Sequence, residues 1–371
     1  MLELPDYPWN QLAPYRELAA KHQDGVVDLS IGTPVDDTPQ VIQEALAQAA
    51  NSHGYPTTHG TPDVRQAIVD WYARRRQVTG LSIDDVMPTV GSKEMVAWLP
   101  LLLGMGPQDI LVRPSIAYPT YDIGAKLVGA TAIATDDLNE LNDEERARVK
   151  LVWVNSPGNP TGKVRDLESL RQLVFQAREL GAVVASDECY AELGWDEYEG
   201  AVPSVLDPRV NDGNLDNLLS LYSLSKQSNL AGYRAAFVAG APNLMPTLVN
   251  SRKHAGMIVP GPIQHAMVVA LGDDEHVVAQ REIYRARREM LRPALENFGL
   301  TIEDSVAGLY LWCTEGQSSW QTLQRLAEIG IVAGPGAFYG TAGELHVRVA
   351  LTGSDERIAA AVERLNSSAN R

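Results

Sequence analysis

The chain has 371 residues, of which 45% are hydrophobic and 21% charged, and this is the composition of an ordinary soluble globular protein. Its formal net charge of −16 argues against non-specific binding to nucleic acid or to anionic membranes, because both need a basic face. Two cysteines, Cys189 and Cys313, exclude a disulfide framework and a cysteine cluster for zinc, and the seven histidines form no close ligand pair, so we expect no metal.

The N-terminal segment 1–12 (MLELPDYPWNQL) has neither the basic region nor the apolar stretch of a signal peptide. The longest strongly apolar stretch, 96–105, is too short to span a membrane. These two features predict a cytoplasmic protein.

Two early segments carry the sequence signal of a helix start. Thr38 is the expected N-cap of a helix over 38–50, with Pro39 at its first position, and Thr61 and Pro62 repeat the signal in 61–76. The second segment places four large side chains on one helix face: Val64, Ile68, Trp71 and Tyr72.

Short apolar segments alternate with helix-length stretches through most of the first 270 residues. The predicted strands are 84–90, 109–114, 131–135, 150–155, 181–187, 217–223 and 235–240. They are apolar on both faces, which predicts an α/β fold with a mostly parallel sheet covered by helices.

Beyond about residue 275 the pattern changes to a long charged helix, a strand around 308–314, a helix at 318–329, a strand around 344–351 and a final helix. This order predicts a smaller α+β domain. We expect a large domain over 31–274 and a small domain made of 1–30 plus 275–371, with the opening 30 residues packing across both.

The long charged helix contains a locally basic stretch, REIYRARREMLRP, at 281–293. We interpret it as a solvated face of that helix. A nucleic-acid patch is the alternative.

Polar residues follow the ends of four predicted strands: Gly91-Ser92, the stretch 155–159, Asp187 and the stretch 223–226. In open α/β sheets, ligands bind at the carboxyl ends of the strands. The four strand ends therefore predict one common site.

Three segments at these strand ends resemble the signature segments of fold-type-I pyridoxal-phosphate aminotransferases: NSPGNPTGKV at 155–164, SDECYAELGW at 186–195 and SLSKQSNLAGYR at 223–234. The resemblance extends over essentially the whole chain. It implies the aminotransferase fold and pyridoxal 5'-phosphate as the cofactor.

By this resemblance Lys226 forms the Schiff base with the cofactor, a role that requires a partly deprotonated amine. Burial and cationic neighbours lower the pKa of such a lysine. Asp187 would hold the protonated ring nitrogen, which the cofactor needs to act as an electron sink. Tyr190 and Asn159 would donate hydrogen bonds to the phenolic oxygen of the cofactor.

The cofactor's phosphate needs fixed donors. Gly91, Ser92 and Lys93 open a predicted helix, whose N-terminus attracts anions. The resemblance adds four further residues around the phosphate: Ser223, Ser225, Arg234 and Tyr55. Tyr55 would come from a neighbouring subunit, which implies a homodimer with shared active sites.

The family also places an aromatic side chain over the cofactor ring, for which Tyr118 is the candidate and Tyr121 the rival. Arg348 lies on an otherwise apolar strand and would grip the α-carboxylate of the substrate. Gly32 and Asn159 would also lie against the substrate.

Segments outside the cofactor shell, such as LPDYPWNQLA and GLYLWCT, resemble the actinobacterial type of N-succinyl-L,L-diaminopimelate aminotransferase. This likeness implies ping-pong amino transfer between glutamate and N-succinyl-2-amino-6-oxopimelate in lysine and diaminopimelate biosynthesis. Arg252 and Lys253 are candidates for the distal end of that substrate.

Three alternatives stay open. One is a broad-specificity aspartate-type or aromatic-type aminotransferase, and another is a carbon–sulfur lyase on the same fold. The third is a cofactor-sensing regulator, but such proteins carry an added DNA-binding segment, and we see none before Gly25 in this acidic chain.

Overall fold

The computed structural model describes residues 4–368. None of the helices in this range combines the length and the apolar character that a membrane crossing requires.

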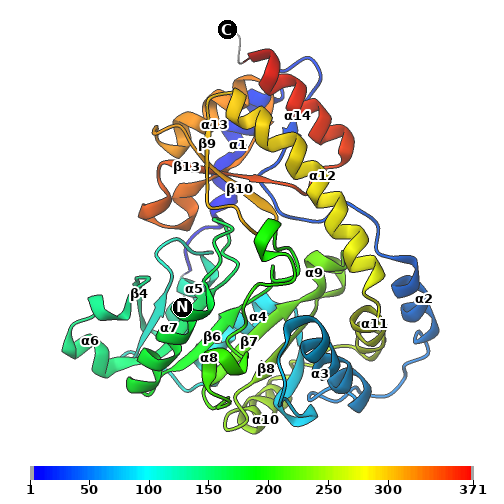
Figure 1. Cartoon of the computed structure of the whole chain (residues 1–371), viewed down its shortest axis with the longest axis vertical. Coiled ribbons are helices and arrows are strands. Elements are labelled where there is room, and N and C mark those ends of the chain that lie inside the picture. The colour runs from blue at the N-terminus through cyan, green and yellow to red at the C-terminus, as the bar shows by residue number, and fades with distance from the viewer. Residues whose placement is uncertain (1–3, 369–371) are drawn as a thin grey trace.

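Within the described residues, seven strands form one large sheet in the order β2-β8-β7-β6-β5-β3-β4 (Figure 1). Their bounds are β2 Val86–Val90, β3 Ile110–Arg113, β4 Thr131–Ala134, β5 Val149–Asn155, β6 Val183–Asp187, β7 Leu218–Ser223 and β8 Ala235–Gly240. All seven predicted strands are therefore confirmed. Only β8 runs antiparallel to its neighbours, so the carboxyl ends of the other strands meet at one edge.

Helices cover both faces of this sheet, as the apolar strands require. One face is covered by α3 (Pro62–Arg76), α7 (Leu167–Glu179), α8 (Pro208–Asn211) and α11 (Gly261–Gly272). The other is covered by α4 (Ser92–Leu102), α5 (Thr120–Val128) and α10 (Met245–Ala255). The short helices α6 (Asp143–Arg148) and α9 (Leu224–Gln227) precede β5 and follow β7.

The two predicted helix starts have different outcomes. Thr61 caps α3 and accepts from Val64 N, and the predicted apolar face of α3 is buried. At α2 (Gln40–Gln48) the prediction is wrong by one residue, because Pro39 keeps an extended ψ of 138° and becomes the N-cap. The Thr38 hydroxyl instead donates to the Asn229 carbonyl over 3.2 Å.

The C-terminal elements form a second layer above the large sheet in Figure 1. A four-stranded antiparallel sheet contains β12 (Gly334–Pro335), β13 (His346–Ala350), β10 (Tyr310–Thr314) and β9 (Thr301–Glu303) in this order. It packs with α12 (Glu275–Asn297), α13 (Ser319–Glu328) and α14 (Asp355–Ser368).

The N-terminal segment joins this second layer. β1 (Val27–Asp28) pairs in parallel with β11 (Ile331–Val332), and α1 (Ala13–Ala19) contacts α13. Trp9 lies against Tyr118 of the large part and against Phe338, so the segment touches both parts. We propose the domain boundaries at 30/31 and 274/275 on this basis.

The basic stretch 281–293 lies on α12, but it is not simply a solvated face. Arg281 and Arg287 are buried and form ion pairs with Glu199 and Asp36. Arg288 is buried as well and donates to the Ser305 carbonyl over 3.3 Å. The ion pairs of Arg281 and Arg287 join α12 to the large part, whereas the Arg288 bond stays within the second layer. Together they correct the expectation of a solvated helix face.

Candidate active site

A cavity of about 490 Å³ lies at the carboxyl edge of the large sheet, where β10 and β13 of the second layer close over it. It brings together twelve of the residues predicted from the sequence: Gly32, Ser92, Lys93, Tyr118, Asn159, Asp187, Tyr190, Ser223, Ser225, Lys226, Arg234 and Arg348. The predicted strand ends thus meet at one cavity, and the roles of these residues stay predictions.

Lys226 lies on α9, a single turn whose N-cap is Ser223. Its ammonium donates to the carbonyl oxygen of Gly32, which holds the side chain inside the cavity. Burial lowers the pKa of Lys226, and the charges of Arg348 and Arg234 lower it further. The direction agrees with the expectation for a Schiff-base lysine, because a lowered pKa makes the neutral, nucleophilic amine easier to form.

Asp187 ends β6 and turns its carboxylate into the cavity. Burial raises the pKa of Asp187, while hydrogen bonds from Cys189 and Tyr121 oppose that shift. The distances are 3.3 Å from Cys189 N to Oδ1 and 3.0 Å from the Tyr121 hydroxyl to Oδ2. A buried carboxylate with fixed donors is suited to hold a cationic partner inside the cavity.

Asn155, at the end of β5, fixes the neighbouring strand ends. Its amide donates to the Asp187 carbonyl over 3.0 Å, and its Oδ1 accepts from Asn159 N over 2.8 Å. Asn155 belongs to the polar stretch 155–159, but its role depends on β5 and β6 being adjacent, which the sequence does not reveal.

Arg348 of β13 is 2% exposed and reaches across the cavity to Asn159. Its Nη1 donates to Asn159 Oδ1 over 2.9 Å and its Nη2 to the Ser30 carbonyl over 2.7 Å. Among the residues that the structure describes, its Nε is a buried donor without an acceptor. Arg348 also lines the cavity, so its cationic guanidinium lies beside any anion bound there.

Tyr310 is a cavity residue that the sequence reasoning missed. Its hydroxyl lies 3.2 Å from that of Tyr190, and its ring centroid lies 3.9 Å from the Arg348 guanidinium. Burial and the neighbouring Tyr310 raise the pKa of Tyr190 well above its usual value, so Tyr190 keeps its proton and can donate it. The segment GLYLWCT stands out in the sequence, but only the pairing of β10 with β13 places Tyr310 beside Arg348.

Arg234, Ser223 and Ser225 add a guanidinium and two hydroxyls to the cavity lining. Arg234 adopts the left-handed conformation with φ 56°, and Ser223 Oγ lies 2.9 Å from Ser225 Oγ. Gly91 does not line the cavity. Its N–H donates to the Arg234 carbonyl over 2.8 Å, and any side chain at this position would collide with the Arg234 guanidinium. Its N–H is therefore not free for a phosphate, contrary to expectation, and Gly91 acts by leaving room for Arg234.

Tyr118 and Tyr121 have separate environments. Tyr121 is fully buried and bound to Asp187, whereas the Tyr118 hydroxyl lies 3.4 Å from Lys93 Nζ at the cavity wall. The Lys93 ammonium lies 5.6 Å from the centroid of the Tyr7 ring and 5.3 Å from that of Tyr118. We propose Tyr118 as the aromatic over a cofactor ring, because Tyr121 is held at the carboxylate.

Three further candidates lie outside the cavity. The side chain of Tyr55 is fully exposed, at 101%. Arg252 is completely buried, pairs with Glu94 and donates to the Met257 carbonyl, so it is not available to a substrate as predicted. Lys253 is an exposed residue of α10 and does not line the cavity.

The donor set matches what pyridoxal phosphate requires. The cavity presents an amine of lowered pKa at Lys226, a carboxylate at Asp187, and a phenol that keeps its proton at Tyr190. The hydroxyls of Ser223 and Ser225 and the Arg234 guanidinium are donors in the same cavity that suit a phosphate. Fold and site together define an aminotransferase-like α/β enzyme that uses this cofactor.

Comparison with known proteins gives the family. The chain matches the model of class I and II aminotransferases over residues 24–365 and therefore belongs to this family, whose members depend on pyridoxal phosphate. It has the class I aminotransferase fold.

Two relatives are each 51% identical to this chain. One is the 4-dedimethylamino-4-oxo-anhydrotetracycline transaminase OxyQ of Streptomyces rimosus, with 98% of this chain and 100% of the relative covered. The other is the probable aminotransferase Rv1178 of Mycobacterium tuberculosis, with 98% and 85% covered. Among solved structures, a probable N-succinyldiaminopimelate aminotransferase of Thermus thermophilus is similar, with a TM-score of 0.86, 28% identity, and 97% and 99% of the two chains covered.

Proposed function

We propose that this aminotransferase transfers the amino group of glutamate to N-succinyl-2-amino-6-oxopimelate, in lysine and diaminopimelate biosynthesis. The observation that carries the proposal is a pair of cationic groups on the walls of one cavity. Arg348 and Lys93 both line the cavity, and neither takes part in an ion pair among the described residues. Both substrates carry an α-carboxylate and a second carboxylate at a distance. The similarity to the probable N-succinyldiaminopimelate aminotransferase of Thermus thermophilus supports the same substrate.

The roles of the chain's own residues follow from their positions. When bound, pyridoxal phosphate would supply the aldehyde that takes over the amino group and the ring that accepts the electron pair. Lys226 Nζ would accept the proton of the amino acid's α-carbon and return a proton to the oxo carbon of the second substrate. Asp187 would hold the ring nitrogen, and Tyr190 and Asn159 would donate to the phenolic oxygen. Arg348 would orient both substrates by the α-carboxylate.

We further propose a homodimer with shared active sites, because the fully exposed Tyr55 ring has no place in its own cavity. Mixing Lys226→Ala chains with Tyr55→Ala chains tests this. If sites are shared, a mixed dimer contains one intact site and regains about a quarter to a half of wild-type activity, since only that site is complete. Activity that stays at the level of the separate variants would refute shared sites.

The cytoplasmic location expected from the sequence stays a prediction.

The substrate is tested with the two half-reactions of the purified holoenzyme, followed by the cofactor spectrum. Glutamate and N-succinyl-L,L-diaminopimelate should each convert the cofactor to its amine form at comparable kcat/KM, and Lys93→Met should weaken both through KM. No response to the succinylated amino acid would refute the substrate choice and leave the aminotransferase assignment intact.

The second candidate is a broad-specificity aminotransferase of the aspartate or aromatic type. The 51% identity to OxyQ, a transaminase named for an oxo-anhydrotetracycline, favours testing a polycyclic oxo substrate as well. Aspartate, phenylalanine and 4-dedimethylamino-4-oxo-anhydrotetracycline serve as competing substrates in the same assay. A thioether amino acid that releases a thiol and pyruvate would instead identify a carbon–sulfur lyase.

A further inference from the structure

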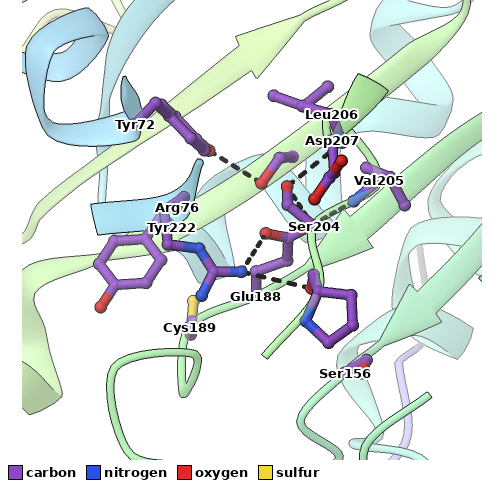
Figure 2. Close-up of polar contacts among 12 residues, drawn as sticks. Tyr72, Arg76, Ser156, Glu188, Cys189, Ser204, Val205, Leu206, Asp207 and Tyr222 are labelled. Carbon is purple, nitrogen blue, oxygen red and sulfur yellow. Dashed lines mark hydrogen bonds and ion pairs between the residues drawn. The ribbon is translucent and has the colours of Figure 1, made fainter. Parts of the chain in front are cut away.

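Directly after Asp187, the chain buries an ion pair behind the active site (Figure 2). Arg76 Nη2 lies 3.1 Å from Glu188 Oε2, and the two side chains are only 3% and 1% exposed. Asp187 lines the cavity, whereas Glu188 and Arg76 do not. The pair thus lies outside the candidate active-site cavity, and Glu188 is adjacent in sequence to the carboxylate proposed to serve the cofactor ring.

Glu188 is fully engaged by its surroundings, as Figure 2 shows. Its Oε1 accepts from the Ser204 hydroxyl and from Val205 N, both over 3.0 Å. Arg76 donates a second bond to the Pro203 carbonyl over 3.3 Å. One carboxylate therefore ties together the last residue of α3, the loop 203–205 and the segment that follows β6.

The backbone of this segment is fixed at the same point. Glu188 N donates to the Leu221 carbonyl of β7 over 2.9 Å, and the Asp187 carbonyl accepts from Asn155. The Asp187 carbonyl and Glu188 N belong to one peptide group, so this peptide group and the buried Glu188 side chain hold the main chain directly after Asp187. Among the described residues, the Asp187 carboxylate receives bonds from the Tyr121 hydroxyl and from Cys189 N, and its position also depends on this main chain.

Stability alone does not account for a buried pair of this kind. Desolvation of the two charges roughly cancels their attraction, and an apolar pair of similar volume is often as stable. A geometric role explains why charges are used, since a carboxylate with three donors from two other segments, α3 and the loop 203–205, admits few alternative positions.

We propose that Arg76 and Glu188 are positioning residues that hold the end of β6 so that Asp187 faces the ring nitrogen of the cofactor. The inference rests on the proposed role of Asp187. Loss of the pair should move Asp187 without removing any group that touches the substrate. Arg348 and Asn159, on β13 and after β5, keep their own contacts.

The test compares Arg76→Met and Glu188→Gln with wild type, using the pH dependence of the bound cofactor's absorption, its dissociation constant, and the kcat and KM for glutamate. In both variants we expect kcat to fall about tenfold or more with KM changed less than about threefold, the range seen when outer partners of a functional group are removed. The midpoint pH of the absorption change should shift, and Arg76→Lys should recover part of each effect.

Two controls separate positioning from folding. Arg364→Met removes another buried arginine, which donates to the carbonyls of Gly330 and Gly25 in the second layer, and should leave the cofactor absorption unchanged. The double variant Arg76→Met with Glu188→Gln leaves no unpaired buried charge, so its thermal stability should recover while the absorption shift persists. Recovery of turnover and absorption together with stability would overturn the proposal.

The variant Asp187→Asn separates a failure of the positioning role from a failure of the role proposed for Asp187 at the cofactor ring. If Asp187→Asn leaves the cofactor absorption unchanged, the proposed role of Asp187 fails and the positioning role fails with it. If Asp187→Asn changes the absorption and Arg76→Met does not, only the positioning role is overturned.

Discussion

The hydroxyl of Tyr121 donates to Asp187 Oδ2 over 3.0 Å, and it joins α5 to the end of β6 beneath the cavity. The bond opposes the effect of burial, which raises the pKa of Asp187. Tyr121 therefore helps to keep Asp187 ionised, and a carboxylate must be ionised to stabilise a protonated ring nitrogen.

Tyr121→Phe should weaken catalysis most at low pH. Without the donor the pKa of Asp187 rises further, so the acidic limb of kcat should move to higher pH, with a loss of about threefold to tenfold at its steepest point. The pH profile of kcat with glutamate measures this. Tyr118→Phe removes a hydroxyl that does not touch Asp187 and should leave the acidic limb in place. An unmoved limb in Tyr121→Phe would contradict the role.

The strands and the start of α3 could be predicted because each depends on local sequence. Residue type and position at strand ends or on an apolar strand singled out Lys226, Asp187 and Arg348, but the roles proposed for them come from the resemblance to the family. Arg76 could not be placed, since its partner Glu188 is 112 residues away in the chain.

The wrong expectations share one cause, which is tertiary contact overriding a local pattern. Arg252 on α10 has the sequence context of a solvated helix residue or a substrate ligand. In the structure it forms a buried ion pair with Glu94 of α4 instead. The arginines of 281–293 were expected to face solvent, and acidic residues of distant segments bind them instead. Ion pairs between distant segments leave no periodic signal in the sequence.

Lys226→Ala should abolish amino transfer and prevent borohydride from fixing the cofactor to the chain. Loss of a general acid–base group alone lowers rates by about 10²-fold to 10⁴-fold, and loss of the covalent attachment adds to this. Mass spectrometry of the reduced protein is the measurement. Lys253→Ala, which changes an exposed lysine of α10, should keep the adduct. A retained adduct in Lys226→Ala would mean that another lysine holds the cofactor.

Arg348→Lys should impair carboxylate recognition. Lysine cannot keep the forked contacts to Asn159 Oδ1 and the Ser30 carbonyl while it also binds a carboxylate, so kcat/KM for glutamate should fall about 100-fold. The discriminating measurement uses an amine without an α-carboxylate, whose slow reaction should be nearly unchanged in the variant. An equal loss for both compounds would show a general disturbance of the cavity instead.

Arg252→Met should destabilise the protein without changing its substrate preference. It leaves the Glu94 carboxylate without its partner in a largely buried place, at a cost of about 3 kcal/mol in the free energy of unfolding. Denaturant unfolding measures the loss, and adding Glu94→Gln should recover part of it. A changed ratio of kcat/KM between glutamate and the succinylated amino acid would contradict the structural role.

His276 should make stability depend on pH. Its Nε2 lies 2.7 Å from the Ser228 hydroxyl and its Nδ1 lies 3.1 Å from Asp273 Oδ2, yet burial outweighs Asp273 and lowers the pKa of His276. Because the unfolded chain has a histidine pKa of about 6.5, it binds more protons than the folded chain at and below that pH. The contribution of His276 to folding stability is therefore present above about pH 6.5 and is lost as the pH falls from there through the lower pKa of the folded state. His276→Gln should reduce the fall in Tm between about pH 7.5 and about pH 5.5, by an amount that linkage relates to the lost pKa difference. His254→Gln, at an exposed position on α10, should leave that fall unchanged, and an equal fall in His276→Gln and wild type would refute the assignment.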